Sequence, residues 1–232
     1  MRTGLLVAVV AGVLLSACAP QIVQLPASEG QRPAHFPEQE YGQAAAHGRA
    51  VYRVDPASSS VVIEVYRDGP LARLGHDHVV ASHATQGYVL PDAGRADLYV
   101  ALDRLAVDEP VLRAEAGFDT QPSPEDIAGT RRNMLGSVLD AARYPFVLVH
   151  VMNVDVSGSS RMAQVSITLH GATRAMDVPL NVQTTADEID VSGRIVLRQT
   201  DFGIVPLSVL GGAVQVKDAI DLRFRIHALR MR

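Results

Sequence analysis

Closely spaced histidines are the residues of this chain whose types and positions could support metal or redox chemistry. His76 and His78 flank Asp77, and His83 follows shortly after. Alternate residues of a strand share one face, so both rings of a His-x-His pair can reach one zinc or similar ion. His150 would be the third ligand. These histidines could instead lie at the mouth of a barrel, bonded to the backbone or to Asp77, and both interpretations stay open.

Motifs of the common enzyme classes are missing from the sequence, which contains no GxSxG nucleophile motif, glycine-rich phosphate loop, paired-cysteine metal site or HExxH motif. A net charge of -4 and an isoelectric point near 6.0 argue against binding to nucleic acid, which needs a basic surface. We therefore expect a protein that is not an enzyme and requires no cofactor or metal. Two alternatives stay open: a metal- or haem-linked redox or stress enzyme that uses the His76/His78 region, and a structural partner of an envelope complex.

The N-terminus carries a different chemistry, centred on the single cysteine of the chain. Arg2 precedes an apolar run, residues 5–15, that is too short to span a membrane and is typical of a signal peptide. The run ends in Leu15-Ser16-Ala17-Cys18, which resembles the lipobox of bacterial lipoproteins. That resemblance implies cleavage after residue 17 and lipidation of Cys18, whose thiolate is the nucleophile. Because position 19 is Ala and not Asp, the same resemblance implies an anchor in the outer membrane, facing the periplasm, in an organism that has one.

The sequence divides into three parts: a signal segment (1–17), a lipidated tether (18–49) and one domain (50–232). Four prolines lie among Gln, Ala, Gly and Ser between residues 19 and 48, where no helical or strand period persists. Such a segment buries too little apolar area to offset its ordering entropy. We therefore expect a flexible tether that holds the domain off the membrane.

Alternation of apolar and polar residues dominates the domain and predicts antiparallel strands. About eight strands can close into a barrel wide enough for a small ligand, although a two-sheet sandwich would give the same pattern. The inward faces would form an apolar lumen, or else a filled core. The predicted ligand-lining residues are Val61, Ile63, Val65, Leu148, His150, Met152, Val165, Ile167, Ile195, Leu222 and Phe224.

The segment 146–152 is apolar on both faces, which indicates that its outer side is covered. The preceding residues 126–142 carry apolar side chains at helical spacing, after a Ser-Pro start typical of a helix N-terminus. We therefore expect one helix outside the barrel, packed against this strand. Parity with Phe146 and Leu148 would direct His150 toward the lumen.

Four segments in order resemble the YceI-like family, over about residues 51–230. They are Tyr52-Arg53-Val54-Asp55 with 58–65, Thr130 to Leu135 followed by Ala141 to Pro145, Leu169 to Arg174, and Arg198 to Ile204. The resemblance implies an all-β fold, an extended lipocalin-like antiparallel barrel that binds a polyisoprenoid lipid in its lumen. The charged segment 74–78 departs from the simpler family pattern.

Together these observations predict a membrane-tethered protein that holds an isoprenoid amphiphile, of the quinone or polyprenol type, in an apolar barrel. The partners would be this lipid and, through Cys18, the membrane of the cell envelope. A homodimer is compatible with the sequence.

Overall fold

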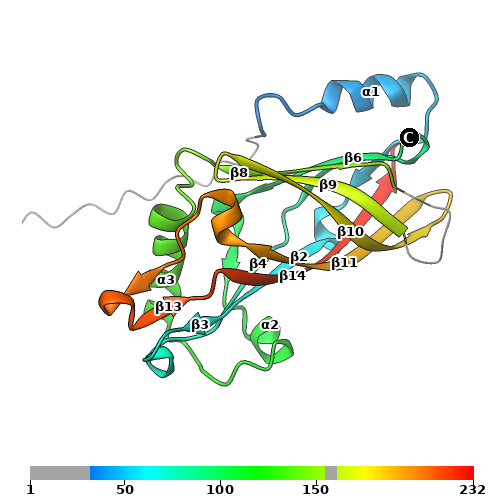
Figure 1. Cartoon of the computed structure of the whole chain (residues 1–232). Helices are drawn as coiled ribbons and strands as arrows, with labels where there is room; N and C mark the ends of the chain where they lie inside the picture. Colours follow the sequence, from blue (N-terminus) through cyan, green and yellow to red (C-terminus); the bar gives the residue numbers. More distant parts are fainter. Residues whose placement is uncertain (1–31, 155–160) are drawn as a thin grey trace, which may run out of the picture.

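The computed structural model describes residues 32–154 and 161–232. The signal segment and Cys18 lie outside the described residues. Antiparallel strands dominate the described residues, and the sheet wraps into a barrel with helices at one end and on its outside (Figure 1).

Eight strands form the closed ring of the barrel, which confirms the barrel prediction and excludes an open sandwich. The order around the ring is β1-β5-β6-β8-β9-β10-β11-β14, and β14 pairs back to β1. The bounds are β1 Tyr52–Val54, β5 Gln86–Leu90, β6 Arg95–Ala101, β8 Phe146–Met152, β9 Arg161–Leu169, β10 Ala172–Thr184, β11 Glu188–Arg198 and β14 Ala219–Arg230.

Three further strands lengthen the barrel at one end: β2 (Ser60–Val65), β4 (His78–Ser82) and β7 (Ala106–Val107). They pair in the order β14-β2-β4-β7. This order corresponds to the ring order β14-β1-β5-β6, and all of these pairings are antiparallel. β1 and β2 thus act as two halves of one interrupted strand along β14, and β4 and β5 as two halves of the next. A small sheet of β3 (Arg67–Asp68), β12 (Ser208–Val209) and β13 (Val214–Val216) lies beyond this end.

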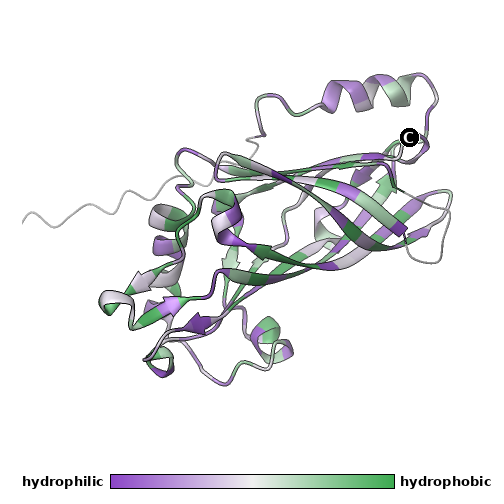
Figure 2. Ribbon diagram, viewed as in Figure 1, coloured by the Kyte–Doolittle hydropathy of each residue, from purple (hydrophilic) through white to green (hydrophobic). Residues whose placement is uncertain are grey.

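Hydropathy alternates along the strands (Figure 2), as a sheet with one apolar and one polar face requires. The largest cluster of buried residues comes from β9, β10 and β11 with Phe202 and Ile204, and it faces the interior. A two-residue turn at His170-Gly171 joins β9 to β10. Both residues have positive φ, 51° and 76°, which matches the tight hairpin turn that a twisted pair of strands favours.

The helix α1 (Glu38–Ala46) lies within the segment expected to be a flexible tether, so that prediction is wrong for this part of residues 18–49. Tyr41 on α1 is only 1% exposed and packs with Val51 and Leu90. Arg49 forms a two-pronged ion pair with Asp92, at 2.8 Å for both nitrogens. One buried aromatic ring and a few ion pairs thus hold this segment against the barrel, although its overall composition is typical of a linker.

The predicted helix is present as α3 (Pro124–Asn133), continued by a π-helical turn, Met134–Val138. Its N-terminus has the expected cap, since Ser123 and Asp126 bond reciprocally. The position differs from the prediction, because α3 lies at the end of the barrel opposite the C-terminus (Figure 1) and its last turns line the interior.

A third helix, α2 (Pro110–Glu115), lies beside the outer face of β2 and β4, where Leu112 and Ala116 pack against buried valines. None of the described helices is long and apolar enough to cross a membrane.

Candidate ligand-binding cavity

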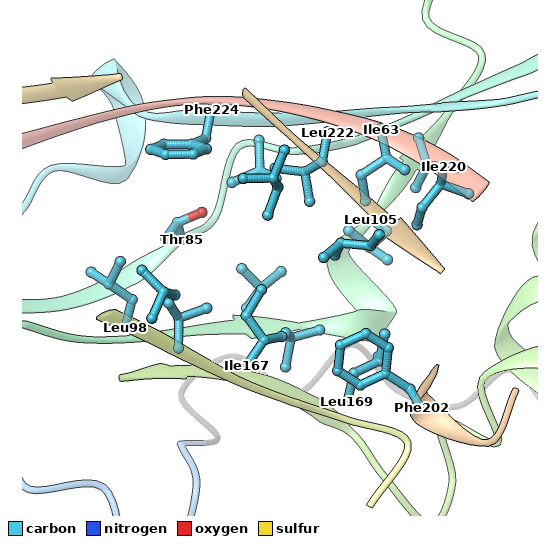
Figure 3. A pocket seen from close by; sticks show the side chains of 18 of the residues that line it. Ile63, Thr85, Leu98, Leu105, Ile167, Leu169, Phe202, Ile220, Leu222 and Phe224 are labelled. Carbon is cyan, nitrogen blue, oxygen red and sulfur yellow. The ribbon is translucent and has the colours of Figure 1, made fainter. Parts of the chain in front are cut away.

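The barrel encloses an apolar cavity of about 590 Å³. Small-molecule sites typically measure about 300–1,000 Å³. Figure 3 shows side chains from several strands converging on this space, and among its labelled residues only Thr85 is polar. The wall is mostly branched and aromatic apolar residues, including Val61, Ile63, Val65, Val147, Val149, Val151, Val165, Ile167, Val178, Leu180, Val191, Ile195, Leu222 and Phe224.

Most of the residues predicted to line the ligand site do line this cavity: Val61, Ile63, Val65, Val165, Ile167, Ile195, Leu222 and Phe224. The prediction is wrong for Leu148, His150 and Met152. On β8 the cavity is lined instead by Val147, Val149 and Val151, so the inward and outward faces of this strand are exchanged relative to the prediction.

The outer face of β8 is partly covered, by Tyr99 of β6 and the N-terminal segment rather than by α3, and Met152 at its end is 42% exposed. Phe36 packs edge-on against Tyr99 of β6 with ring centres 4.8 Å apart, and Tyr99 in turn packs against Phe146 at 5.8 Å. Tyr41 stacks on Tyr88 at 5.2 Å. This aromatic cover lets β8 carry apolar residues outward, which is why its two faces look alike in the sequence.

His150 belongs to a polar network beneath α1. Its Nδ1 lies 2.5 Å from the Asp97 carboxylate, which also accepts hydrogen bonds from the Tyr41 hydroxyl at 2.7 Å and from Arg95 Nε at 2.8 Å. Burial, reinforced by the hydrogen bond to Asp97, raises the pKa of Tyr41 well above its usual range. The network fastens the N-terminal segment to β6 and β8, and His150 takes part in that attachment rather than in the cavity.

Two histidines lie at the α3 end of the cavity. His76 and His78 both line it, with ring centres 6.2 Å apart in an edge-on arrangement. His78 Nδ1 lies 2.6 Å from Asp108 Oδ2. His76 Nδ1 is buried and has no hydrogen-bond partner among the described residues.

Asp108 and Arg113 form a buried ion pair behind His78. The Arg113 side chain is 3% exposed and that of Asp108 0%, and the guanidinium donates to Asp108 Oδ1 at 2.6 Å. Burial raises the pKa of the Asp108 carboxyl, but hydrogen bonds from His78, the Val79 amide and Arg113 outweigh it and hold the pKa below its usual range. The carboxylate is therefore ionised, and His78 Nδ1 must be the donor in their hydrogen bond.

The three-histidine metal site suggested by the sequence does not assemble. His76 and His78 face the cavity, whereas His150 lies on the outer face of β8, bonded to Asp97. Among the described residues, one other group has metal-ligand geometry, Glu188, Asp190 and His227. Arg225 Nη2 and His227 Nδ1 each lie 3.3 Å from Asp190 Oδ1, so the Asp190 carboxylate already has two partners within the protein.

Thr85 places a hydroxyl in the wall of the apolar cavity, at the break between β4 and β5. The residue is 2% exposed, and its Oγ1 has no partner among the described residues. Sequence analysis identified neither Thr85 nor Asp108. The one available signal for Thr85 is its position between two strand-like runs, where an interruption of the ladder leaves polar groups unpaired.

Replacing Thr85 with the similarly shaped valine should raise the free energy of unfolding of the ligand-free protein by about 1 kcal/mol, because an unpaired buried hydroxyl costs about that much. Urea denaturation measures the difference. Thr173→Val is the matched control, since its exposed hydroxyl already pairs with Thr168 at 2.8 Å. Equal effects of the two substitutions would show that the Thr85 hydroxyl is not the cause.

A closed antiparallel barrel around an apolar cavity defines a lipocalin-like class of fold, and the comparisons with known proteins give the family. Residues 52–228 match the model of the YceI-like domain family. The chain therefore belongs to the YceI-like family. Among curated proteins, none matches the sequence.

Two solved structures share the fold at low sequence identity. A polyisoprenoid binding domain from Saccharophagus degradans, described as implicated in plant cell wall breakdown, is 15% identical with a TM-score of 0.55. The match covers 78% of this chain and 98% of that one. BcnA of Burkholderia cenocepacia is 14% identical with a TM-score of 0.51, over 75% of this chain and 98% of its own.

Proposed function

We propose that this protein binds an isoprenoid amphiphile, of the quinone or polyprenol type, inside its barrel. The observation that carries the proposal is the enclosed apolar cavity, which extends from His76 and Met134 at the α3 end to Thr184 and Ile189 at the other. A long hydrocarbon tail gains about 0.8 kcal/mol for each buried methylene and needs few polar contacts. A branched aliphatic wall suits such a tail.

Two observations support a binding protein. The family is one of binding proteins, and the similar Saccharophagus degradans domain is described as polyisoprenoid binding. Most of the cavity wall is apolar, and four of the charged or histidine side chains that line it, Arg67, His78, Arg95 and Arg198, pair with carboxylates of the protein, which fits retention of a largely apolar molecule.

The experiment is identification of the molecule that co-purifies with the full chain. Native mass spectrometry should show a bound species that disappears after organic extraction, and mass spectrometry of the extract should show a series spaced by isoprene units. Recovery of only phospholipids or fatty acids would contradict the isoprenoid assignment. A wild-type protein that neither carries nor takes up any apolar molecule would contradict the binding function.

We further propose that a lipid on Cys18 tethers the barrel to the outer membrane, on its periplasmic side. The Leu15-Ser16-Ala17-Cys18 sequence supports this proposal. Metabolic labelling with palmitate should mark the wild type and not Cys18→Ser, and membrane fractionation should place the label. Equal labelling of both proteins would contradict the tether. A homodimer stays a prediction.

A further inference from the structure

At the α3 end of the cavity, the buried Nδ1 of His76 has no hydrogen-bond partner among the described residues. His76, His78 and Val80 alternate along the chain at the start of β4, and all three line the cavity. Val79 and Ala81, which lie between and after them, are buried on the opposite face of the strand. The two imidazoles therefore face the cavity at its α3 end. An amphiphile whose tail points from the α3 end toward Thr184 would bring its head group to these rings.

The hydrogen bonds of His78 determine what its cavity-facing edge can do. The Asp108 carboxylate accepts from the Val79 amide at 3.0 Å and from Arg113 at 2.6 Å, so its bond to His78 requires a proton on Nδ1. In a neutral imidazole the opposite nitrogen, Nε2, is then an acceptor. This tautomer is assigned from the bonding partners. His78 thus presents a hydrogen-bond acceptor that a buried carboxylate orients.

His76 has the complementary requirement. Among the described residues no acceptor lies within hydrogen-bond distance of its buried Nδ1, so a proton there would be an unsatisfied donor, and the neutral ring is better satisfied with its proton on Nε2. His76 then offers a donor. One oxygen can bond to two nitrogens that lie about 4.5 to 5.5 Å apart. Ring centres 6.2 Å apart are compatible with that spacing.

The nearby cations are already neutralised, which disfavours a charged head group. Arg67 lines the same end of the cavity and pairs with Asp77 at 3.4 Å and Asp119 at 3.2 Å. Arg198 also lines the cavity and lies 3.6 Å from Asp218. A diphosphate would have to compete with these carboxylates, whereas a neutral group would not.

We propose that His76 and His78 form a head-group site for a hydroxyl, which accepts a hydrogen bond from His76 Nε2 and donates one to His78 Nε2. A hydroxyl is the simplest group that both accepts and donates through one oxygen, so the ligand class is an isoprenoid alcohol or the reduced, phenolic form of a quinone. This inference rests on the proposed function, because it assumes a tail in the barrel.

The test uses the full chain, stripped of bound lipid, and four probes that share one tetraprenyl tail: the alcohol, its methyl ether, the diphosphate and the hydrocarbon. Displacement of a fluorescent apolar probe gives each Kd. The wild type should bind the alcohol about 3- to 10-fold more tightly than the methyl ether, which keeps the oxygen but lacks its proton; this corresponds to one net hydrogen bond. The diphosphate should bind more weakly than the alcohol.

Two variants separate the two hydrogen bonds. His78→Asn keeps a nitrogen near Asp108 but removes Nε2, so the preference for the alcohol over the ether should disappear. His76→Leu removes no side-chain hydrogen bond between the described residues, and it should weaken binding of the alcohol and the ether alike while leaving the hydrocarbon Kd unchanged. His83→Leu is the control, since His83 is exposed and paired with Glu109 at 2.8 Å. It should change none of the four Kd values.

The outcomes distinguish this inference from the function on which it rests. Equal affinity of the wild type for alcohol and ether, tightest binding of the diphosphate, or an unchanged preference in His78→Asn would overturn the hydroxyl site and leave lipid binding intact. Failure of all four probes to bind the wild type would overturn the proposed function itself. Circular dichroism identifies a variant that does not fold, and His76→Leu still tests the site if His78→Asn fails to fold.

Discussion

Replacing Arg113 with methionine should lower the free energy of unfolding by about 3–5 kcal/mol, because it leaves the Asp108 carboxylate buried without its charged partner. The pair is almost fully enclosed, and Arg113 also donates to the Asp77 carbonyl at 2.6 Å and to the Thr120 carbonyl at 2.5 Å. Loss of these hydrogen bonds therefore removes contacts that hold the segment 108–120 against the start of β4. Urea denaturation gives the free energy, with the slope checked for two-state behaviour.

Arg225→Met is the matched control for this prediction. Arg225 pairs with Asp190 at 3.3 Å, but its side chain is 67% exposed. Exposed pairs of this kind contribute about 0–1 kcal/mol. Similar losses in the two variants would mean that burial does not set the contribution of the Asp108–Arg113 pair.

Replacing Val149 with tryptophan should weaken tail binding in the cavity by roughly fiftyfold. Val149 points into the cavity from the middle of β8, so the added ring would displace tail. Loss of roughly three buried methylenes at about 0.8 kcal/mol each gives that factor. The Kd of the tetraprenyl hydrocarbon is the measurement, since this probe reports on the tail alone.

The neighbouring residue provides a control from the opposite face of the same strand. Leu148→Trp places an equally large ring on the outer side, where it should leave the hydrocarbon Kd unchanged and affect only the packing of the N-terminal segment. A larger effect on binding from Leu148→Trp than from Val149→Trp would mean that the inward face of β8 is the one that contains Leu148 and His150.

The barrel and most of its lining could be predicted because strands with one apolar and one polar face show in their sequence which residues point inward. In β9 and β11, apolar residues alternate with polar ones, so Val165, Ile167 and Ile195 had to face inward. On β8 both faces are apolar, and periodicity does not distinguish the lumen from a covered outer surface. The assignment of His150 depended on this strand and was wrong.

The cover of β8 could not be predicted because the signal is a few aromatic residues in a segment with the composition of a linker. Phe36 and Tyr41 stand among prolines, glutamines and alanines, and local propensity gives no reason for order there. Their order comes from tertiary contacts with Tyr88 and Tyr99, residues distant in the sequence. In the same way, the buried pair of Asp108 and Arg113 depends on a turn in which Asp108 has φ of 57°, which no local motif marks.

The pairing of β14 has a consequence for how the chain reaches this fold. β14 is the last strand in the sequence, yet it joins β11 on one side and both β1 and β2 on the other, with Tyr52 opposite Arg230. Ring closure thus pairs strands from near the two ends of the domain, which are far apart in the sequence. Topologies that depend on such distant contacts fold slowly. A nascent chain lacking its final strand has open edges at β1, β2 and β11. The ring therefore closes only once β14 has been synthesised, so a ligand can be enclosed only by a chain that includes this strand.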